Sequence, residues 1–399
     1  MRGVIPVSEN IFWIGMNDHE TDLFESIWPL PRGVSYNSYI INDDKVVLID
    51  SVKSSYISRY LEKIKSVIGQ KGKIDYLVVN HMEPDHSGAI KTLLRMYPQM
   101  KIIGNKKTAE FIKDFYGIEE NVIQVKEGET LDTGSHTLQF FMAPMVHWPE
   151  TMVTYDQKSK VAFTCDAFGG FGALDDRIFD DEVDKVYYED EILRYFSNIV
   201  GRYSGMVQKA IAKLSKVEIA VIAPSHGPVW RENPQEIIEL YDKWSRHETE
   251  KGVVIAYASM YGNTGKMMET ISRTLAEQEV EKVRVFDMSR THVSHALVDI
   301  WRFGGMILGA PTYNTKLFPV MNNLVTILKN KMLKNRSIGI FGTYGWSKGG
   351  VAAMQDFAES SNLELVEPVV EVKCSPTPED LEKCEELGKN MAATVCDLD

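Results

Sequence analysis

The sequence predicts two α/β domains, an N-terminal domain of short paired strands and a C-terminal domain with a doubly wound parallel sheet. At 399 residues the chain is too long for one ordinary hydrophobic core. Before about residue 250, β-branched strands alternate with hairpin turns, and after it strands alternate with helices. We therefore predict domains at residues 1–250 and 251–399, with a junction in the charged segment 246–251.

Two strand pairs are typical of the N-terminal half. In residues 37–50, the polar segment 42–45 predicts a turn between two apolar strands. A second pair, 152–155 and 161–164, is separated by a polar turn.

In the C-terminal half, apolar runs predict buried strands at 253–258, 282–286, 306–308, 337–341 and 363–372. Helical patterns follow at 266–278, 321–329 and 378–395. Five strands alternating with helices indicate a doubly wound parallel sheet.

Composition excludes several classes of protein. The net charge of −12 argues against a nucleic-acid partner, because phosphate binding needs a basic surface. No apolar run approaches the roughly 20 residues of a membrane helix, and the N-terminus lacks the apolar stretch of a secretory signal. We expect a cytoplasmic protein without a membrane partner. The four cysteines include no CxxC pair, so we expect buried or surface thiols and no rubredoxin-type or iron–sulfur site in the chain.

The segment His81-Met82-Glu83-Pro84-Asp85-His86 directly follows an apolar strand at 74–80. Three more polar residues lie just past apolar strands, namely His147, Asp166 and His226. Each alone has an ordinary explanation, such as a hydrogen-bonded histidine or a turn aspartate. Together they predict a metal site, which we expect where strand ends meet at one edge of the sheet.

This pattern resembles the metallo-β-lactamase fold, an αβ/βα sandwich with a dinuclear site. Glu83 stands where that family has a second histidine, and this difference resembles the flavodiiron branch. An added carboxylate favours iron over zinc. The resemblance implies that His81, Glu83 and His147 bind one iron, that Asp85, His86 and His226 bind the other, and that Asp166 bridges them.

Direct binding by His86 stays open, because in flavodiiron proteins this position can stand off from the metal. His19, within Asp18-His19-Glu20, and Tyr195 are candidates for groups that orient ligands or assist protonation. An ordinary structural role is the alternative for both.

A turn rich in hydroxyl, amide and glycine groups follows the strand at 253–258, and a helix is expected from near Lys266. Such a turn at a helix N-terminus is an anion site, and its spacing fits neither the dinucleotide nor the Walker A pattern. It resembles the phosphate loop of flavodoxins, which binds FMN. Two further loops follow the third and fourth strands, where the ligand crevice of such a sheet forms. The predicted FMN-binding residues are Ser259, Met260, Tyr261, Gly262, Asn263, Thr264, Pro311, Thr312, Tyr313, Asn314, Thr343, Tyr344, Gly345 and Trp346.

The resemblance to flavodiiron proteins covers essentially the whole chain. It implies FMN and two Fe ions per chain, with dioxygen reduced to water or nitric oxide to nitrous oxide. It also implies a head-to-tail homodimer, or a dimer of dimers, and a separate rubredoxin-like electron donor. Two alternatives remain: a zinc hydrolase of the metallo-β-lactamase type with an appended flavodoxin domain, and an electron carrier whose N-terminal site is vestigial. The sequence does not choose between O2 and NO.

Overall fold

The computed structural model describes residues 3–70, 72–175 and 177–396, and it divides into two compact units. The first spans residues 1–245 and the second residues 246–399. The sequence placed the boundary after residue 250, which is the first residue of strand β17 (Glu250–Tyr257). Each unit has its own sheets and core, and each is described by itself.

The first unit contains two extended sheets, and the first of them has seven strands. Their order is β1 (Ile5–Ser8), β2 (Ile11–Trp13), β7 (Tyr39–Asn42), β8 (Val46–Ile49), β9 (Tyr76–Val78), β10 (Lys101–Gly104) and β11 (Val122–Gln124). Strands β7 and β8 form the predicted hairpin, with Asn42 opposite Val46. Strands β8 to β11 run parallel. Strand β9, which precedes His81, lies inside this sheet between β8 and β10.

The second sheet has five strands. Their order is β12 (Thr130–Asp132), β13 (Thr137–Met142), β14 (Met152–Asp156), β15 (Val161–Cys165) and β16 (Val221–Pro224). The predicted hairpin of β14 and β15 is confirmed, since Thr154 lies opposite Phe163. Two short ribbons complete the strands of this unit. They are β3 (Met16–Asp18) with β6 (Val34–Tyr36), and β4 (Leu23–Phe24) with β5 (Trp28–Pro29).

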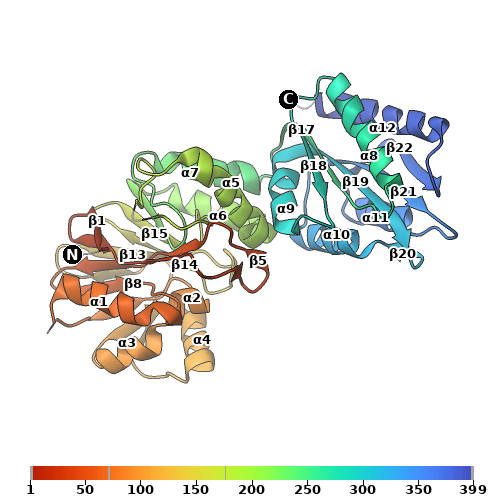
Figure 1. Cartoon of the computed structure of the whole chain (residues 1–399). Coiled ribbons are helices and arrows are strands. Elements are labelled where there is room, and N and C mark those ends of the chain that lie inside the picture. The colour runs from red at the N-terminus through yellow and green to blue at the C-terminus, as the bar shows by residue number, and fades with distance from the viewer. Residues whose placement is uncertain (1–2, 71, 176, 397–399) are drawn as a thin grey trace. The chain divides into compact units, whose positions relative to one another are not determined.

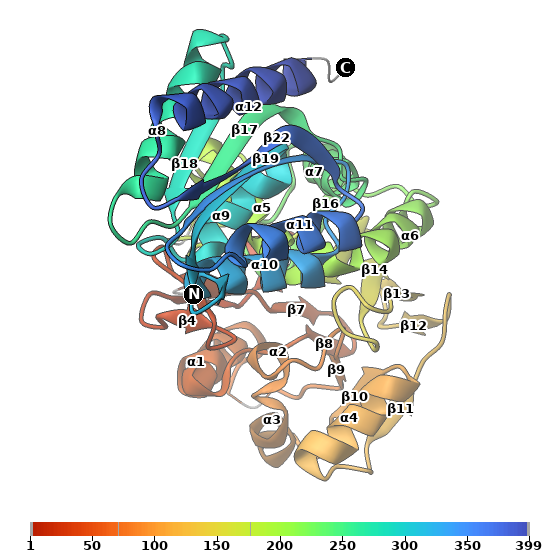
Figure 2. The ribbon, with the colours of Figure 1, turned by 90° about the vertical axis from the view of Figure 1, so that its right-hand side faces the viewer.

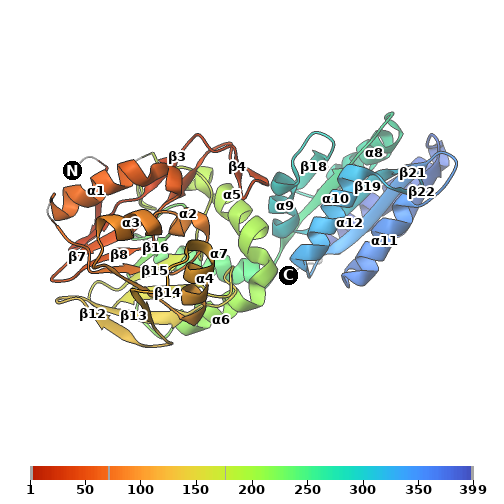
Figure 3. The ribbon, with the colours of Figure 1, turned by 90° about the horizontal axis from the view of Figure 1, so that it is seen from below.

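Helices cover the outer faces of both sheets (Figure 1). On the side of the first sheet, seen from below in Figure 3, lie α1 (Ile57–Ile68), α2 (Pro84–Ser87), α3 (Ile90–Met96) and α4 (Lys106–Tyr116). On the side of the second lie α5 (Lys185–Tyr195), α6 (Ser204–Leu214) and α7 (Pro234–Ser245). Helix α1 buries Tyr60 and Ile64, which are four residues apart and so share one face. The unit is therefore an αβ/βα sandwich.

The second unit has one parallel sheet. Its order is β18 (Val283–Asp287), β17, β19 (Phe303–Tyr313), β21 (Ser337–Tyr344) and β22 (Glu364–Lys373), with the short β20 (Lys316–Leu317) antiparallel to β19. Figure 2 shows α8 (Asn263–Glu277) and α12 (Pro378–Cys396) on one face, and α9 (Val293–Arg302), α10 (Pro319–Lys331) and α11 (Gly350–Ser360) on the other. The predicted doubly wound sheet is confirmed.

The structure corrects several predicted boundaries. Strand β19 extends far beyond the predicted 306–308, because parallel neighbours on both sides bury its glycine-containing start. Helix α8 begins at Asn263, earlier than expected, and the predicted loop after His81 contains the short helix α2 with Pro84 at its first position. Strand β16 begins at Val221, later than expected. Among the described residues, no helix is long and apolar enough to cross a membrane.

Candidate metal centre and phosphate-binding loops

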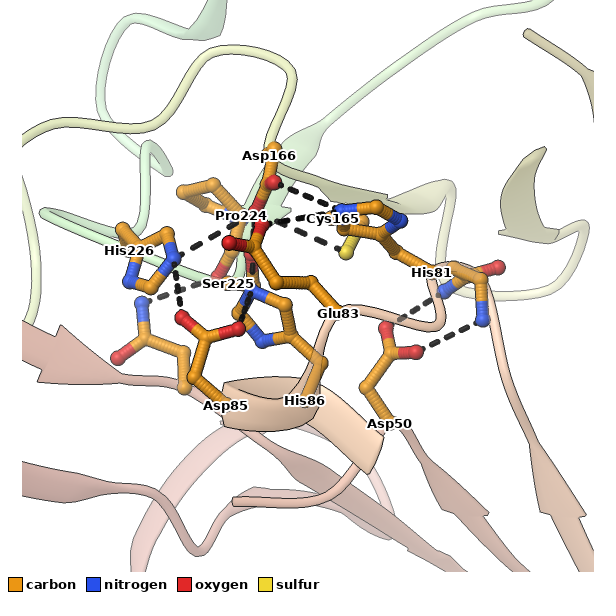
Figure 4. A network of polar contacts seen from close by, with 12 residues as sticks. Asp50, His81, Glu83, Asp85, His86, Cys165, Asp166, Pro224, Ser225 and His226 are labelled. Atoms are coloured by element: carbon orange, nitrogen blue, oxygen red, sulfur yellow. Dashed lines mark hydrogen bonds and ion pairs between the residues drawn. The ribbon is translucent and has the colours of Figure 1, made fainter. Parts of the chain in front are cut away.

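The seven predicted metal-binding side chains lie together at one end of the sandwich (Figure 4 labels six of them). His81 and Glu83 follow β9, and Asp85 and His86 lie on α2. His147, Asp166 and His226 follow β13, β15 and β16, whose carboxyl ends share one edge of the second sheet. The prediction that a single sheet edge supplies all of them is therefore wrong, because β9 belongs to the other sheet.

Asp166 lies at the centre and divides the cluster into two groups. Its Oδ2 faces His81 Nε2 at 3.4 Å and His147 Nε2 at 3.0 Å. Its Oδ1 faces His86 Nε2 at 3.0 Å and His226 Nε2 at 3.5 Å. Glu83 completes the first group, 3.0 Å from His147, and Asp85 completes the second, 3.4 Å from both His86 and His226. The two groups thus face different oxygens of the same carboxylate, that of Asp166.

These spacings fit metal ions. Ligand atoms about 2.1 Å from one ion, at angles of roughly 90–110°, are about 3.0–3.5 Å apart, as they are here. Several buried polar atoms have no hydrogen-bond partner among the described residues, including both oxygens of Asp85, Nε2 of His226 and Oδ2 of Asp166. Buried polar atoms without partners cost free energy unless an ion satisfies them. The donor set of imidazole and carboxylate groups suits iron.

The four histidines all turn Nε2 toward Asp166, and hydrogen bonds at Nδ1 fix two of them. His81 Nδ1 donates to Glu150 Oε1 at 2.7 Å, and His226 Nδ1 donates to the Ser35 carbonyl at 2.6 Å. The Ser225 hydroxyl donates to Asp166 Oδ1 at 2.7 Å. Sequence reasoning missed Glu150 and Ser225. The only available signal was their closeness along the chain to His147 and His226.

The pKa values of the histidines and carboxylates in the cluster depend on one another. Burial by itself lowers the pKa of His81, but the surrounding carboxylates, led by Asp166, outweigh this effect and raise the pKa of His81 to about 10. The same opposition raises the pKa of His147 to about 10 and that of His86 to about 9, with Asp85 the leading carboxylate for His86. Burial raises the pKa of Asp166, but the histidines reverse this and hold it well below its usual value. Without metal, protonated histidines therefore balance the carboxylates.

We expect metal-free protein to lose stability as the pH rises from about 7 to 10. Histidines with raised pKa values stabilise the fold while they are protonated, and this contribution disappears as the pH passes their folded pKa values. The lowered pKa of Asp166 contributes stability at all pH values above its unfolded pKa, so it does not offset the loss. Thermal unfolding of chelator-treated and metal-loaded protein at each pH measures the effect. The gap between the two melting temperatures should widen with pH, and parallel curves would contradict the assignment.

A cavity of about 360 Å³ opens beside the cluster. Its lining includes Glu83 and Asp85 from the cluster, and Phe24, Tyr36 and Lys53 from the surrounding wall. The Phe24 ring lies 5.3 Å from the His226 ring, edge to face. Lys53 Nζ donates to the Thr21 hydroxyl at 2.8 Å, so this cation is held in the wall of the cavity. A small apolar molecule entering here reaches carboxylates of both groups.

Tyr195 and His19 differ in position. The Tyr195 ring is buried 5.5 Å from the His226 ring, and its hydroxyl has no partner among the described residues. Burial, and then the charge of Asp166, raise the pKa of Tyr195 well above its usual value, so the hydroxyl keeps its proton. The His19 side chain is 58% exposed and pairs with Asp175 at 3.0 Å. Its position does not support the predicted role for His19, since an exposed imidazole paired elsewhere cannot orient buried ligands.

In the second unit, three loops meet at the carboxyl edge of adjacent strands. They follow β17, β19 and β21, which pair in parallel register with Tyr257 beside Gly309 and Pro311 beside Thr343. In the first loop, Ser259 Oγ accepts hydrogen bonds from the backbone N–H groups of Gly262 and Gly265. Gly262 has φ +88°, a conformation that side chains disfavour. The loop therefore presents N–H groups at the start of α8, where an anion binds well.

The predicted FMN-binding residues lie in these loops and in the elements beside them, where Asn263 and Thr264 begin α8, Pro311 to Tyr313 end β19, and Thr343 and Tyr344 end β21. The hydroxyls of Thr264 and Thr343 lie 3.0 Å apart, which joins the first loop to the third. The aromatic rings are on the surface, with Tyr261 at 89% and Trp346 at 85% exposure. The structure thus brings the loops together, and FMN binding by each residue stays a prediction.

Comparison with known proteins gives matches to both units. Residues 34–227 match the family model described as ODP family beta lactamase, and residues 255–388 match the flavodoxin model. A nitric oxide reductase of Moorella thermoacetica is 33% identical over 402 residues, covering 100% of both chains. The structure of a rubredoxin oxygen:oxidoreductase from Desulfovibrio gigas is similar with a TM-score of 0.95 and 28% identity, covering 98% of both chains. The structure of a flavodiiron protein from Giardia intestinalis is similar with a TM-score of 0.94 and 27% identity, covering 98% of this chain and 97% of that one. The predicted metallo-β-lactamase-like fold of the first unit and the predicted flavodoxin-like fold of the second are both confirmed.

Proposed function

The chain belongs to the flavodiiron protein family, and from that premise we propose that it reduces dioxygen or nitric oxide at two irons with electrons from FMN. The observation that carries this proposal is the position of Asp166, whose two carboxylate oxygens face two separate ligand groups. A bridging carboxylate of this kind suits a pair of metal ions, and a single ion would leave one group unused.

The first iron would be held by His81, Glu83 and His147, the second by Asp85, His86 and His226, with Asp166 between them. When bound, two irons supply open positions for two reactant atoms, and FMN supplies electrons one or two at a time.

The residues of the chain contribute binding, orientation and protons. Phe24 and the ring of Tyr195 form an apolar wall against His226, which favours small uncharged gases over water. The Tyr195 hydroxyl keeps its proton beside the cluster and is the group best placed to donate a hydrogen bond to a bound reactant. Lys53 also lies in the cavity wall, where its Nζ is 3.7 Å from Asp18 Oδ2.

We assign FMN to the three loops of the second unit. Backbone N–H groups and hydroxyls at the start of α8 would hold the 5′-phosphate. The exposed rings of Tyr313 and Trp346 and the half-buried ring of Tyr344 would pack on the isoalloxazine.

We further propose a head-to-tail homodimer, or a dimer of such dimers. Large exposed apolar side chains lie at the phosphate-binding loops, where Tyr261 and Trp346 are the most exposed, and beside the metal cavity, where Leu23 and Ile27 are exposed. Such patches mark interaction surfaces, and pairing these two between subunits would face FMN toward iron. The donor would be a separate rubredoxin-like protein, as the name of the Desulfovibrio gigas relative suggests.

One experiment tests the proposal. Purified protein is reduced without oxygen by a reduced rubredoxin, O2 and NO consumption are followed in parallel, and iron, zinc and FMN are quantified. We expect about two irons and one FMN per chain and rapid consumption of at least one gas. Active protein holding two zinc ions and no iron would favour the hydrolase alternative, and protein that is reduced without consuming either gas would favour the electron carrier.

A further inference from the structure

The four histidines of the cluster differ in what lies behind them. His81 Nδ1 donates to a carboxylate, Glu150 Oε1 at 2.7 Å, whereas His226 Nδ1 donates to a neutral backbone carbonyl, that of Ser35. His86 Nδ1 has no hydrogen-bond partner among the described residues. A carboxylate therefore accepts the Nδ1–H of only one of these three rings, whereas the charge of the buried Asp50 acts on both His86 and His81.

Glu150 is held firmly and carries a charge with few partners. It is completely buried, as is His81. Its Oε1 also accepts from the Met82 N–H at 2.9 Å, and its backbone carbonyl accepts from Asn105 Nδ2. Its Oε2 has no hydrogen-bond partner, and its one ion pair within the described residues is with His81. Burying a carboxylate costs free energy unless a positive charge lies near it. The Glu150 carboxylate therefore favours positive charge on the His81 ring or on a metal ion bound to His81 Nε2.

The two ligand groups consequently differ in the hydrogen bonds behind their imidazoles. Glu83 and Asp85 contribute one carboxylate to each group, and Asp166 is shared. Glu150 adds one further carboxylate that is hydrogen-bonded to the first group, through His81 Nδ1. A carboxylate that accepts the outer N–H of a metal-binding imidazole fixes its tautomer and makes its inner nitrogen a stronger donor.

We infer that Glu150 is a positioning residue that makes the two metal positions unequal, so that the metal bound by His81, Glu83 and His147 is held more tightly and stays ferric to a lower potential. This inference rests on the proposed two-iron function. Nothing in the ligand residues alone distinguishes the two positions in this way, since each offers two histidines, one carboxylate of its own and half of Asp166.

Glu150→Gln tests the inference, because glutamine keeps the size and an acceptor oxygen but removes the charge. Asp156→Asn is the matched control. Asp156 is also completely buried and also pairs with a buried histidine, His136 at 3.1 Å, but neither belongs to the cluster. Two readouts are used besides gas consumption. They are the two affinities for Co²⁺ in metal-free protein and the two iron reduction potentials of loaded protein, followed by the paramagnetic signal of the half-reduced pair.

In Glu150→Gln we expect one Co²⁺ affinity to fall roughly 10- to 100-fold while the other stays near the wild-type value. The lower iron potential should rise, and a tenfold weaker preference for ferric iron corresponds to about 59 mV for one electron. Asp156→Asn should change neither quantity. If Glu150→Gln fails to fold, Glu150→Asp keeps the charge but shortens its reach, and it should lower the same affinity with a smaller change in potential.

Two equal affinities in wild type, or a wild-type pattern in both Glu150 variants, would overturn the inference and leave the two-iron function intact. Equal losses at both positions would also overturn it, because they indicate a general structural role. Wild-type protein that binds no iron pair at all would contradict the proposed function itself.

Discussion

Replacing Asp166 with asparagine is expected to leave fewer than one iron per chain and to lower gas consumption at least about 100-fold, since even groups behind metal ligands cost 10- to 100-fold when removed. Asp166 contacts the Nε2 atoms of all four histidines, at 3.0 to 3.5 Å. Asparagine keeps the volume but loses the charge and one acceptor oxygen, so neither ligand group can share it. Iron content and consumption of O2 and NO measure the change.

The control for this variant is its FMN content. Asp166 lies in the first unit and the phosphate-binding loops lie in the second, so FMN should stay at the wild-type level. Asp166→Asn protein that keeps two irons and the wild-type rate would contradict the central role of this carboxylate.

Replacing Asn263 with aspartate is expected to weaken FMN binding roughly 10- to 30-fold. Asn263 is the first residue of α8, in the loop assigned to the phosphate. A carboxylate about 5 Å from a doubly charged phosphate costs about 2 kcal/mol even in a water-like dielectric. The same charge at a helix N-terminus stabilises the helix, so FMN-free protein should melt at the same or a higher temperature. FMN titration and thermal unfolding measure these opposite effects.

Gln355→Glu is the matched control for this variant, because it adds the same charge at an exposed position of α11 outside the three loops. Its FMN affinity should equal that of wild type. Gas consumption by Asn263→Asp should recover when excess FMN is added, because the variant weakens binding and leaves the metal centre unchanged. Unaltered FMN affinity in Asn263→Asp would place the phosphate elsewhere.

Mixing Asp166→Asn with Asn263→Asp that has been depleted of FMN, with no FMN added, tests the proposed dimer. In a head-to-tail dimer, the Asp166→Asn subunit supplies FMN to the irons of the Asn263→Asp subunit. Random exchange makes about half of the dimers mixed, with one working pair in each, so about a quarter of the wild-type rate should return. A mixture that stays inactive after subunit exchange would indicate electron transfer within one chain.

The candidate metal ligands could be selected from the sequence because their signal is local. His81, Glu83, Asp85 and His86 lie within six positions after an apolar strand, and the parallel arrangement of β9 is set by its neighbours. The phosphate-binding loop was predictable for the same reason, since glycine and hydroxyl residues between a strand and a helix limit the backbone to a few conformations. These local patterns do not show which residue from a distant part of the chain contacts a given side chain.

Glu150 shows this limit. Its carboxylate contacts His81, 69 positions away in the chain, and nothing in its neighbours distinguishes it from the other acidic residues. His19 shows the opposite error, because a histidine between two acidic residues suggested a role near metal, while the fold leaves it exposed beside Asp175. The burial of Glu150 and the exposure of His19 both depend on how the two sheets pack together.

The sequence by itself determined the two α/β domains, the five main strands of the second domain and the kinds of donor atom present, because strand periodicity and turn residues act over a few positions. Only the tertiary structure decided that ligands from two sheets share Asp166, and that one of the two groups has a buried carboxylate behind it. The physical reason is that burial and contact between distant residues arise from side-chain packing across the sandwich, which no short segment of the chain specifies.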